Sequence, residues 1–235
     1  MHNIANNIGR IKTLVDQTRI NSQRIDDEIT ILAASKGQGP EKIVEAWQAG
    51  IRCFGENYLQ EALKKMAVLT DLKVQWHFIG AIQSNKTRDI AAHFSWVHTV
   101  DRLRTAKRLN QHRQGHGEPL NICIQVNIDG EPNKSGVAPK EAMPLARAIA
   151  ELPKLRLRGL MVLPRLRSTF DAQREAFRRT AELLEAIKNS SPQLRCLDTL
   201  SMGMSDDLAA AVTEGATIVR IGTGIFGPRQ TRAPT

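Results

Sequence analysis

The chain has 235 residues, of which 41% are hydrophobic and 24% are charged, a composition typical of a globular protein with one large domain. No segment approaches the ~20 consecutive apolar residues that a membrane-spanning helix needs. The net charge of +9 suggests an anionic ligand, but the basic residues are spread along the chain and aromatic residues make up only 4%, which argues against a nucleic-acid-binding surface.

The predicted elements begin with an amphipathic helix from Ile4 to Ile20, in which isoleucine and valine recur every three or four positions. A short apolar strand from Ile31 to Lys36 follows, and further strands are predicted over 51–55, 75–80, 96–100, 121–128, 157–163, 197–201 and 217–221. Helices are predicted between them over 41–48, 59–68, 84–93, 102–113, 139–152, 170–189 and 206–212.

Eight strands that alternate with helices predict parallel βαβ units closed into a single (β/α)₈ TIM-type barrel with an extra N-terminal helix. An open doubly wound sheet is the alternative. We expect one domain over residues 1–235, with the barrel at about 31–227 and a frayed tail at 231–235.

In a barrel of this kind, the chemistry lies at the carboxyl ends of the strands. The candidates at those positions are Lys36, Glu56, Asn57, His77, His98, Asn127, Met161, Pro164, Ser201 and Arg220.

Lys36 ends the first predicted strand after a run of small apolar residues. Apolar surroundings remove part of the hydration of a lysine and disfavour its ammonium form. A neutral amine can attack an aldehyde and form a Schiff base. A solvated lysine at a strand end is the alternative.

Two glycine-containing loops follow the seventh and eighth strands, Ser201–Asp207 and Gly222–Gly224. Barrels commonly bind phosphate there through backbone N–H groups and hydroxyls. Two ordinary turns are the alternative, in which Ser205 or Asp206 caps a helix.

Arg220 lies between apolar residues in the last strand, so its charge needs a buried partner, either a ligand or a carboxylate. His77 is more typical of a packed histidine than of a ligand. Asn57 could cap the helix that follows it.

The ordered motifs of this chain resemble one family, the pyridoxal phosphate homeostasis proteins, which are related to the amino-terminal barrel of alanine racemase. The resemblance rests on residues 33–36, 54–58, 76–80, 83–86, 133–136, 159–161, 200–207 and 219–223.

This resemblance implies a barrel that binds pyridoxal 5'-phosphate (PLP) as a Schiff base on Lys36. Asn57 would lie beside the cofactor ring and Arg220 would face the pyridine nitrogen. Ser201, Gly222 and Thr223 would hold the phosphate. The family often continues Thr-Lys-Pro after the lysine, whereas this chain has Gln38 in place of the second lysine, which puts any role of that lysine in doubt.

The resemblance also implies a carrier or regulator of intracellular PLP (vitamin B6), rather than an enzyme with catalytic residues. The N-terminal segment from Met1 to Arg10 is polar and lacks the apolar core of a signal peptide, which predicts a cytoplasmic protein. PLP enzymes that form carbanions usually pair the pyridine nitrogen with a carboxylate, which Arg220 cannot replace. A weak amino-acid racemase is the alternative; it needs a second base, for which His77 is the candidate.

We expect PLP-dependent apo-enzymes as recipients, no nucleic acid or membrane partner, and a monomer, because the second domain of racemases is not expected here. The three cysteines, Cys53, Cys123 and Cys196, have no metal-ligand spacing, so we expect buried reduced thiols and no metal site.

Overall fold

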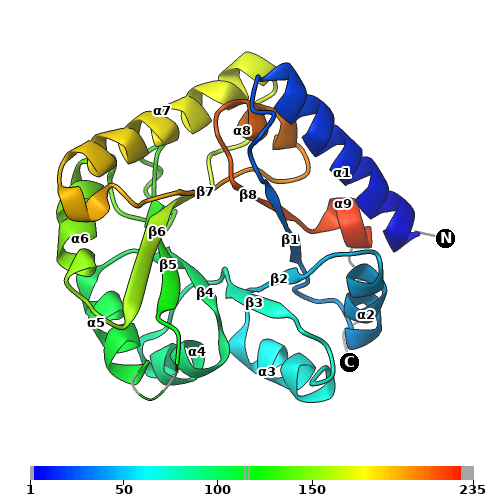
Figure 1. Cartoon of the computed structure of the whole chain (residues 1–235), viewed down its shortest axis with the longest axis horizontal. Helices are drawn as coiled ribbons and strands as arrows, with labels where there is room; N and C mark the ends of the chain where they lie inside the picture. The colour runs from blue at the N-terminus through cyan, green and yellow to red at the C-terminus, as the bar shows by residue number, and fades with distance from the viewer. Residues whose placement is uncertain (1–2, 114, 116, 229–235) are drawn as a thin grey trace.

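The computed structural model describes residues 3–113, 115 and 117–228. Its eight parallel strands form a closed barrel in which each strand pairs with the next and β8 pairs with β1. Figure 1 looks down this barrel, with the strands at the centre and the helices around them. The predicted (β/α)₈ fold is confirmed, and the open sheet is excluded. The tail predicted at 231–235 lies outside the described residues.

The strands are β1 (Thr30–Ala34), β2 (Cys53–Glu56), β3 (Gln75–Phe78), β4 (Trp96–Val100), β5 (Leu120–Val126), β6 (Leu155–Val162), β7 (Thr199–Ser201) and β8 (Ile218–Ile221). The helices are α1 (Ile4–Asn21), α2 (Pro40–Gln48), α3 (Leu59–Val68), α4 (Thr87–His93), α5 (Leu103–His112), α6 (Pro139–Ala150), α7 (Phe170–Asn189), α8 (Leu208–Thr213) and α9 (Thr223–Phe226).

The N-terminal helix α1 packs against α2, α8 and α9 on the outside of the barrel (Figure 1). Its apolar residues Ile4, Ile8 and Val15 are buried, as their helical spacing predicts. The buried Asn7 side chain donates a hydrogen bond to the Ile225 carbonyl of α9 at 2.9 Å. This helix therefore supports the segment that follows β8.

Two apolar regions stabilise the fold. The larger one fills the space between the strands and the surrounding helices. The smaller one lies inside the barrel and consists of Leu32, Trp96, Cys123, Met161 and Ile218. Because alternate residues of a strand point to opposite faces, Ala34 and Lys36 continue the inward row of Leu32, whereas Ser35 points outward.

Three short elements differ from the predictions. The predicted helix over 84–93 begins with a 3₁₀ turn at Ser84–Lys86 before α4. The predicted strand over 197–201 is shortened to β7, because the N–H of Leu197 bonds to the carbonyl of Leu194 in a turn. The segment after β8, interpreted as a glycine-rich turn, forms the four-residue helix α9.

The three cysteines are free thiols, as expected. Cys123 is fully buried in the barrel interior, and this burial raises the pKa of its thiol to about 12. Cys196 is exposed, so the expectation that all three are buried is wrong. Cys196 follows the 3₁₀ turn at Pro192–Leu194 rather than lying in a strand.

Candidate functional site

A cavity of about 510 Å³ opens at the carboxyl ends of the strands. Its lining residues come from β1, β6 and β8 and from the loops that follow the strands. They are Ala34, Lys36, Gln38, Asn57, Ile79, Met161, Leu163, Met204, Ser205, Asp206, Arg220, Gly222, Thr223, Gly224 and Gly227. Five of the six predicted site residues, Lys36, Asn57, Arg220, Gly222 and Thr223, therefore meet in one cavity.

The backbone on both sides of Lys36 is held by an ion cluster formed by the buried Glu56 and Lys65 and the partly exposed Glu61. The ammonium of Lys65 donates to the Ser35 carbonyl at 2.8 Å, to Glu56 at 2.7 Å and to Glu61 at 2.5 Å. The hydroxyl of Ser35 donates to Glu56 at 2.6 Å, and the N–H of Gly37 donates to Glu61 at 2.6 Å.

This cluster lies behind the strand end, between the barrel and α3. Glu56 is fully buried, and burial raises the pKa of its carboxyl, while Lys65 and Ser35 oppose that rise. The neighbours of Lys36 therefore have few alternative conformations. Glu56 was among the residues predicted at the carboxyl ends of the strands, but the sequence alone does not show that its side chain points away from the cavity.

Arg220 lies at the floor of the cavity with only 5% of its surface exposed. Its guanidinium donates to the hydroxyl of Ser201 at 2.9 Å and to the carbonyl of Val162 at 2.8 Å. Among the described residues no carboxylate approaches it within 4.0 Å, so the ion-pair alternative is not found there. Burial lowers the pKa of Arg220 to about 10, and Asp207 opposes this shift.

Ser201 is the exception among the predicted site residues. It is fully buried and does not line the cavity. Its hydroxyl lies beneath the cavity, between Arg220 and a ring nitrogen of His98 at 2.8 Å. The contact of Ser201 with a phosphate therefore stays a prediction, and Ser205 supplies a second hydroxyl in the cavity lining.

Ser205 belongs to the loop between β7 and α8. Its hydroxyl accepts the N–H of Gly224 at 3.2 Å, which joins this loop to the first turn of α9. Gly203 makes the loop possible with φ of 94°, a conformation that favours glycine. The sequence suggested Ser205 or Asp206 as a helix cap, but the cap position is Asp207, whose carboxylate accepts the Met204 N–H at 2.6 Å.

Thr223 opens α9, and Gly222 immediately precedes it at the cap position. In this short helix the N–H of Gly224 donates to the Ser205 hydroxyl, and the N–H groups of Ile225 and Phe226 donate to the Gly222 carbonyl. The start of a helix is the end at which N–H groups can bind an anion such as a phosphate, and the Ser205 hydroxyl lies beside it.

Asn57 follows β2 and contributes to the cavity wall. Its side-chain oxygen is buried and has no hydrogen-bond partner within the described structure, which is unusual for a buried polar atom. It does not cap α3, whose N-cap residue is Tyr58. Gly80 allows the backbone of Asn57 to approach closely, because a Cβ at this glycine would lie 2.0 Å from the backbone carbonyl oxygen of Asn57.

Gln38, where the resemblance leads one to expect a second lysine, lines the cavity and is 8% exposed. Its side-chain oxygen accepts a hydrogen bond from the ammonium of Lys42 at 2.8 Å. Lys42 lies four residues later, on α2, so the two side chains meet on one face of the chain.

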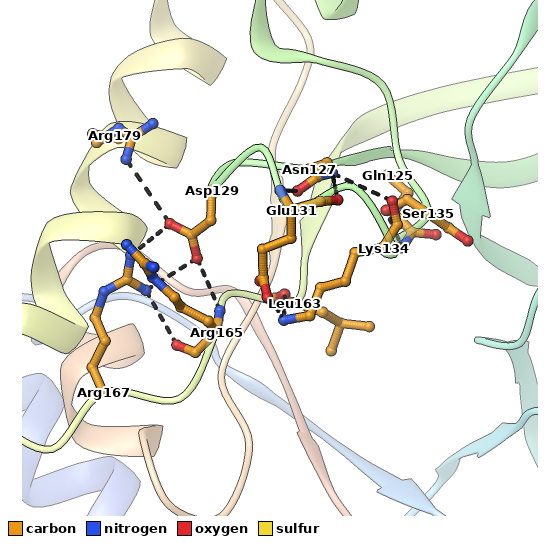
Figure 2. A network of polar contacts seen from close by, with 10 residues as sticks. All are labelled: Gln125, Asn127, Asp129, Glu131, Lys134, Ser135, Leu163, Arg165, Arg167 and Arg179. Atoms are coloured by element: carbon orange, nitrogen blue, oxygen red, sulfur yellow. Dashed lines mark hydrogen bonds and ion pairs between the residues drawn. The ribbon is translucent and has the colours of Figure 1, made fainter.

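The loops after β5 and β6 are held together by polar contacts, as Figure 2 shows. Leu163, in the second of these loops, lines the cavity, so the contacts lie at its rim. Asp129 accepts hydrogen bonds from the N–H of Arg165 at 2.9 Å and from the Arg167 guanidinium at 2.5 Å. Burial opposes ionisation of Asp129, but the bonds from Arg167 and Arg165 prevail and hold its pKa below the usual value. Lys134 donates to the carbonyl of Leu163 at 3.2 Å.

His77, His98 and Asn127 do not line the main cavity. Both histidines are buried in the barrel interior, where His77 stacks on Trp96 with 5.4 Å between the ring centroids. Asn127 holds the loop after β5 by bonds to the backbone of Glu131 and Lys134. His77 is therefore a packed histidine, as the sequence favoured.

Within the described ranges, no cluster of three or more histidine, cysteine or acidic side chains could hold a metal ion. In the same part of the chain, no helix combines the length and the apolar character needed to cross a membrane.

Comparisons with known proteins show the family of this chain. The family described as "Alanine racemase, N-terminal domain" matches residues 2–230. The pyridoxal phosphate homeostasis protein of Pseudomonas aeruginosa is 51% identical over 234 residues, covering 100% of this chain and 99% of that protein. The protein of that name from Escherichia coli is 47% identical over 232 residues, covering 97% and 98%.

The solved structure of PipY from Synechococcus elongatus with PLP bound has a TM-score of 0.84 and 35% identity, covering 95% of this chain and 100% of that chain. An alanine racemase from Clostridium difficile in complex with cycloserine has a TM-score of 0.72 and 14% identity, and shows the fold alone. This chain covers 59% of that racemase. By matches over nearly its whole length, the chain belongs to the pyridoxal phosphate homeostasis protein family and carries the alanine racemase N-terminal domain.

Proposed function

We propose that this protein binds PLP in the cavity at the carboxyl ends of the strands and serves PLP homeostasis as a carrier or regulator. The main support for this proposal is that Lys36, Arg220 and the Gly222–Thr223 segment line the same cavity. A lysine, a donor at the floor and an anion-binding turn match the aldehyde, the ring nitrogen and the phosphate of PLP. The relative with PLP bound supports the same ligand.

In this proposal the amine of Lys36 adds to the aldehyde of PLP and water leaves, which gives a reversible Schiff base. Gly222, Thr223 and Ser205 hold the phosphate, and Asn57 offers its unpartnered oxygen beside the ring. Arg220 donates to the pyridine nitrogen, and Ser201 acts through Arg220.

Absorbance spectroscopy with borohydride reduction tests the Schiff base. The wild type with added PLP should show a visible or near-ultraviolet band that reduction fixes covalently. Lys36→Ala should lose this covalent label, whereas Lys140→Ala, at an exposed lysine of α6, should keep it. Labelling that persists in Lys36→Ala would place the Schiff base on another lysine, and a wild type that takes up no PLP would refute the proposal.

A carrier is favoured over a racemase by the surroundings of the ring. Arg220 has no proton-accepting atom, so it leaves the pyridine nitrogen unprotonated and the ring a weaker electron sink. His77, the candidate second base, is outside the cavity lining. Burial lowers the pKa of His77 to about 3.

Two measurements separate the functions. The PLP-loaded protein should restore activity to a PLP-dependent apo-enzyme. It should not exchange the α-proton of L- or D-alanine in deuterated water faster than free PLP does. Exchange well above that of free PLP, lost in Lys36→Ala, would favour the racemase.

A further inference from the structure

A chain of buried polar side chains crosses the barrel interior beneath the cavity. It begins at Arg220 and passes through Ser201 at 2.9 Å and His98 at 2.8 Å. His98 contacts His77 at 2.9 Å, and His77 contacts the side-chain oxygen of Gln75 at 3.2 Å. The members come from β8, β7, β4 and β3, and Gln75 at the far end is exposed.

Arg220 fixes the direction of this chain, because a guanidinium only donates hydrogen bonds. The Ser201 oxygen accepts from Arg220, so the hydroxyl hydrogen is free to donate to Nδ1 of His98. Neutral His98 then carries its hydrogen on Nε2 and donates to Nδ1 of His77. His77 in turn carries its hydrogen on Nε2 and donates to Gln75.

The opposite direction fails at Ser201. If Nδ1 of His98 carried the hydrogen, the Ser201 oxygen would accept from both His98 and Arg220. The fully buried hydroxyl hydrogen would then have no acceptor among the hydrogen-bond partners of Ser201 in the described residues, and an unsatisfied buried donor is costly. A charged His98 would also lie next to the cation of Arg220.

We propose that Ser201, His98 and His77 are positioning residues that hold Arg220 as a charged donor toward the cavity without a carboxylate counter-ion. Each dipole of the chain presents its acceptor end toward Arg220, and hydrogen bonds in such a series strengthen one another. A carboxylate would instead compete with a ligand for the guanidinium. The effect on PLP rests on the proposed function, whereas the direction of the chain does not.

The direction can be measured without PLP. Long-range ¹H–¹⁵N spectra of the wild-type protein report which ring nitrogen of each histidine carries the hydrogen. We expect His77 and His98 to be neutral and to carry it on Nε2. Assignment uses the variants His77→Phe and His98→Leu, and exposed His93 serves as an internal control. A hydrogen on Nδ1 of either buried histidine, or a charged ring at neutral pH, would contradict the proposed direction of these hydrogen bonds.

Paired variants test the positioning. Ser201→Ala and His98→Leu should weaken PLP binding by roughly fivefold to a hundredfold, as expected for a buried donor that loses its acceptor, and should shift the absorbance band of bound PLP. Ser201→Thr keeps the hydroxyl, and His98→Asn keeps an acceptor near the place of Nδ1, so both should restore affinity and band position. His93→Gln should change neither.

The positioning role would be overturned if Ser201→Ala bound PLP with the same affinity and spectrum as Ser201→Thr, and His98→Leu with the same as His98→Asn. Each variant is first checked for cooperative thermal unfolding. A wild type that binds no PLP would overturn the proposed function together with that role. The ring-nitrogen spectra would still confirm or contradict the direction of the hydrogen bonds. Failure of the proposed function and failure of the hydrogen-bond series are therefore distinguishable.

Discussion

Lys65 is buried behind the strand end that carries Lys36, where it pairs with the buried carboxylate of Glu56 and the partly exposed carboxylate of Glu61. Breaking such a pair by removal of one partner costs about 3–5 kcal/mol, because a charge stays buried without compensation, whereas removal of both is often nearly neutral. Lys65→Met should therefore destabilise the protein by about that amount. Lys65→Met/Glu56→Leu should recover most of it in urea unfolding. If the double variant is less stable than the single one, the cluster acts through packing instead.

Ser205 offers a residue-scale test of the phosphate site. Its hydroxyl lies in the cavity and already accepts the Gly224 N–H. Hydrogen bonds to charged groups contribute about 1.5–3 kcal/mol, so Ser205→Ala should weaken PLP binding by roughly tenfold to a hundredfold. Pyridoxal, which lacks the phosphate, should bind wild type and variant alike in equilibrium titrations. A matched loss for both ligands would place Ser205 away from the phosphate.

At the scale of elements, the two rim loops act as one unit because Asp129 joins them. Asp129→Asn removes the charge that holds Arg165, Arg167 and Arg179 (Figure 2). We expect faster amide hydrogen exchange at residues 163–169 and faster release of PLP, with little change in exchange of the barrel strands. Unchanged exchange in the loop would show that Lys134 and the backbone suffice to hold it.

The alternation of apolar strands and helices was enough to predict the barrel and hence the carboxyl-end location of the site. Sequence periodicity could not place Ser201, because β7 is only three residues long and its inward side chain meets Arg220 below the cavity. It also missed α9, whose four residues are too few for a helical pattern. The pairing of His77 with His98 joins two separate strands, so no local signal could reveal it.

At the scale of the whole molecule, one barrel supplies every residue that lines the cavity. We expect a monomer, as the sequence predicts. Sedimentation equilibrium at micromolar concentration should give a mass near 26.1 kDa, with or without PLP. A dimer whose dissociation weakens PLP binding would contradict this expectation.

The buried histidine pair also makes the stability of the whole fold depend on pH. Burial lowers the pKa of His77 to about 3, and burial, His77 and Arg220 hold the pKa of His98 well below its usual value. In the unfolded chain both titrate near 6.5. Below that pH the unfolded state binds more protons, so these groups reduce stability as the pH falls from about 6.5 toward about 3, by up to about 1.4 kcal/mol per pH unit for each histidine.

Glu56 and Asp207, whose pKa values are raised by burial, contribute with the opposite sign, because the folded state binds their protons at higher pH than the unfolded state does. The histidine contribution is therefore measured as a difference. Urea unfolding between pH 7.5 and 5 should show a steeper loss of stability for wild type than for His77→Phe/His98→Leu, even where the variant is less stable at pH 7.5. Since the other titrating groups are common to both proteins, parallel curves would mean that the pair does not stay neutral in the folded barrel.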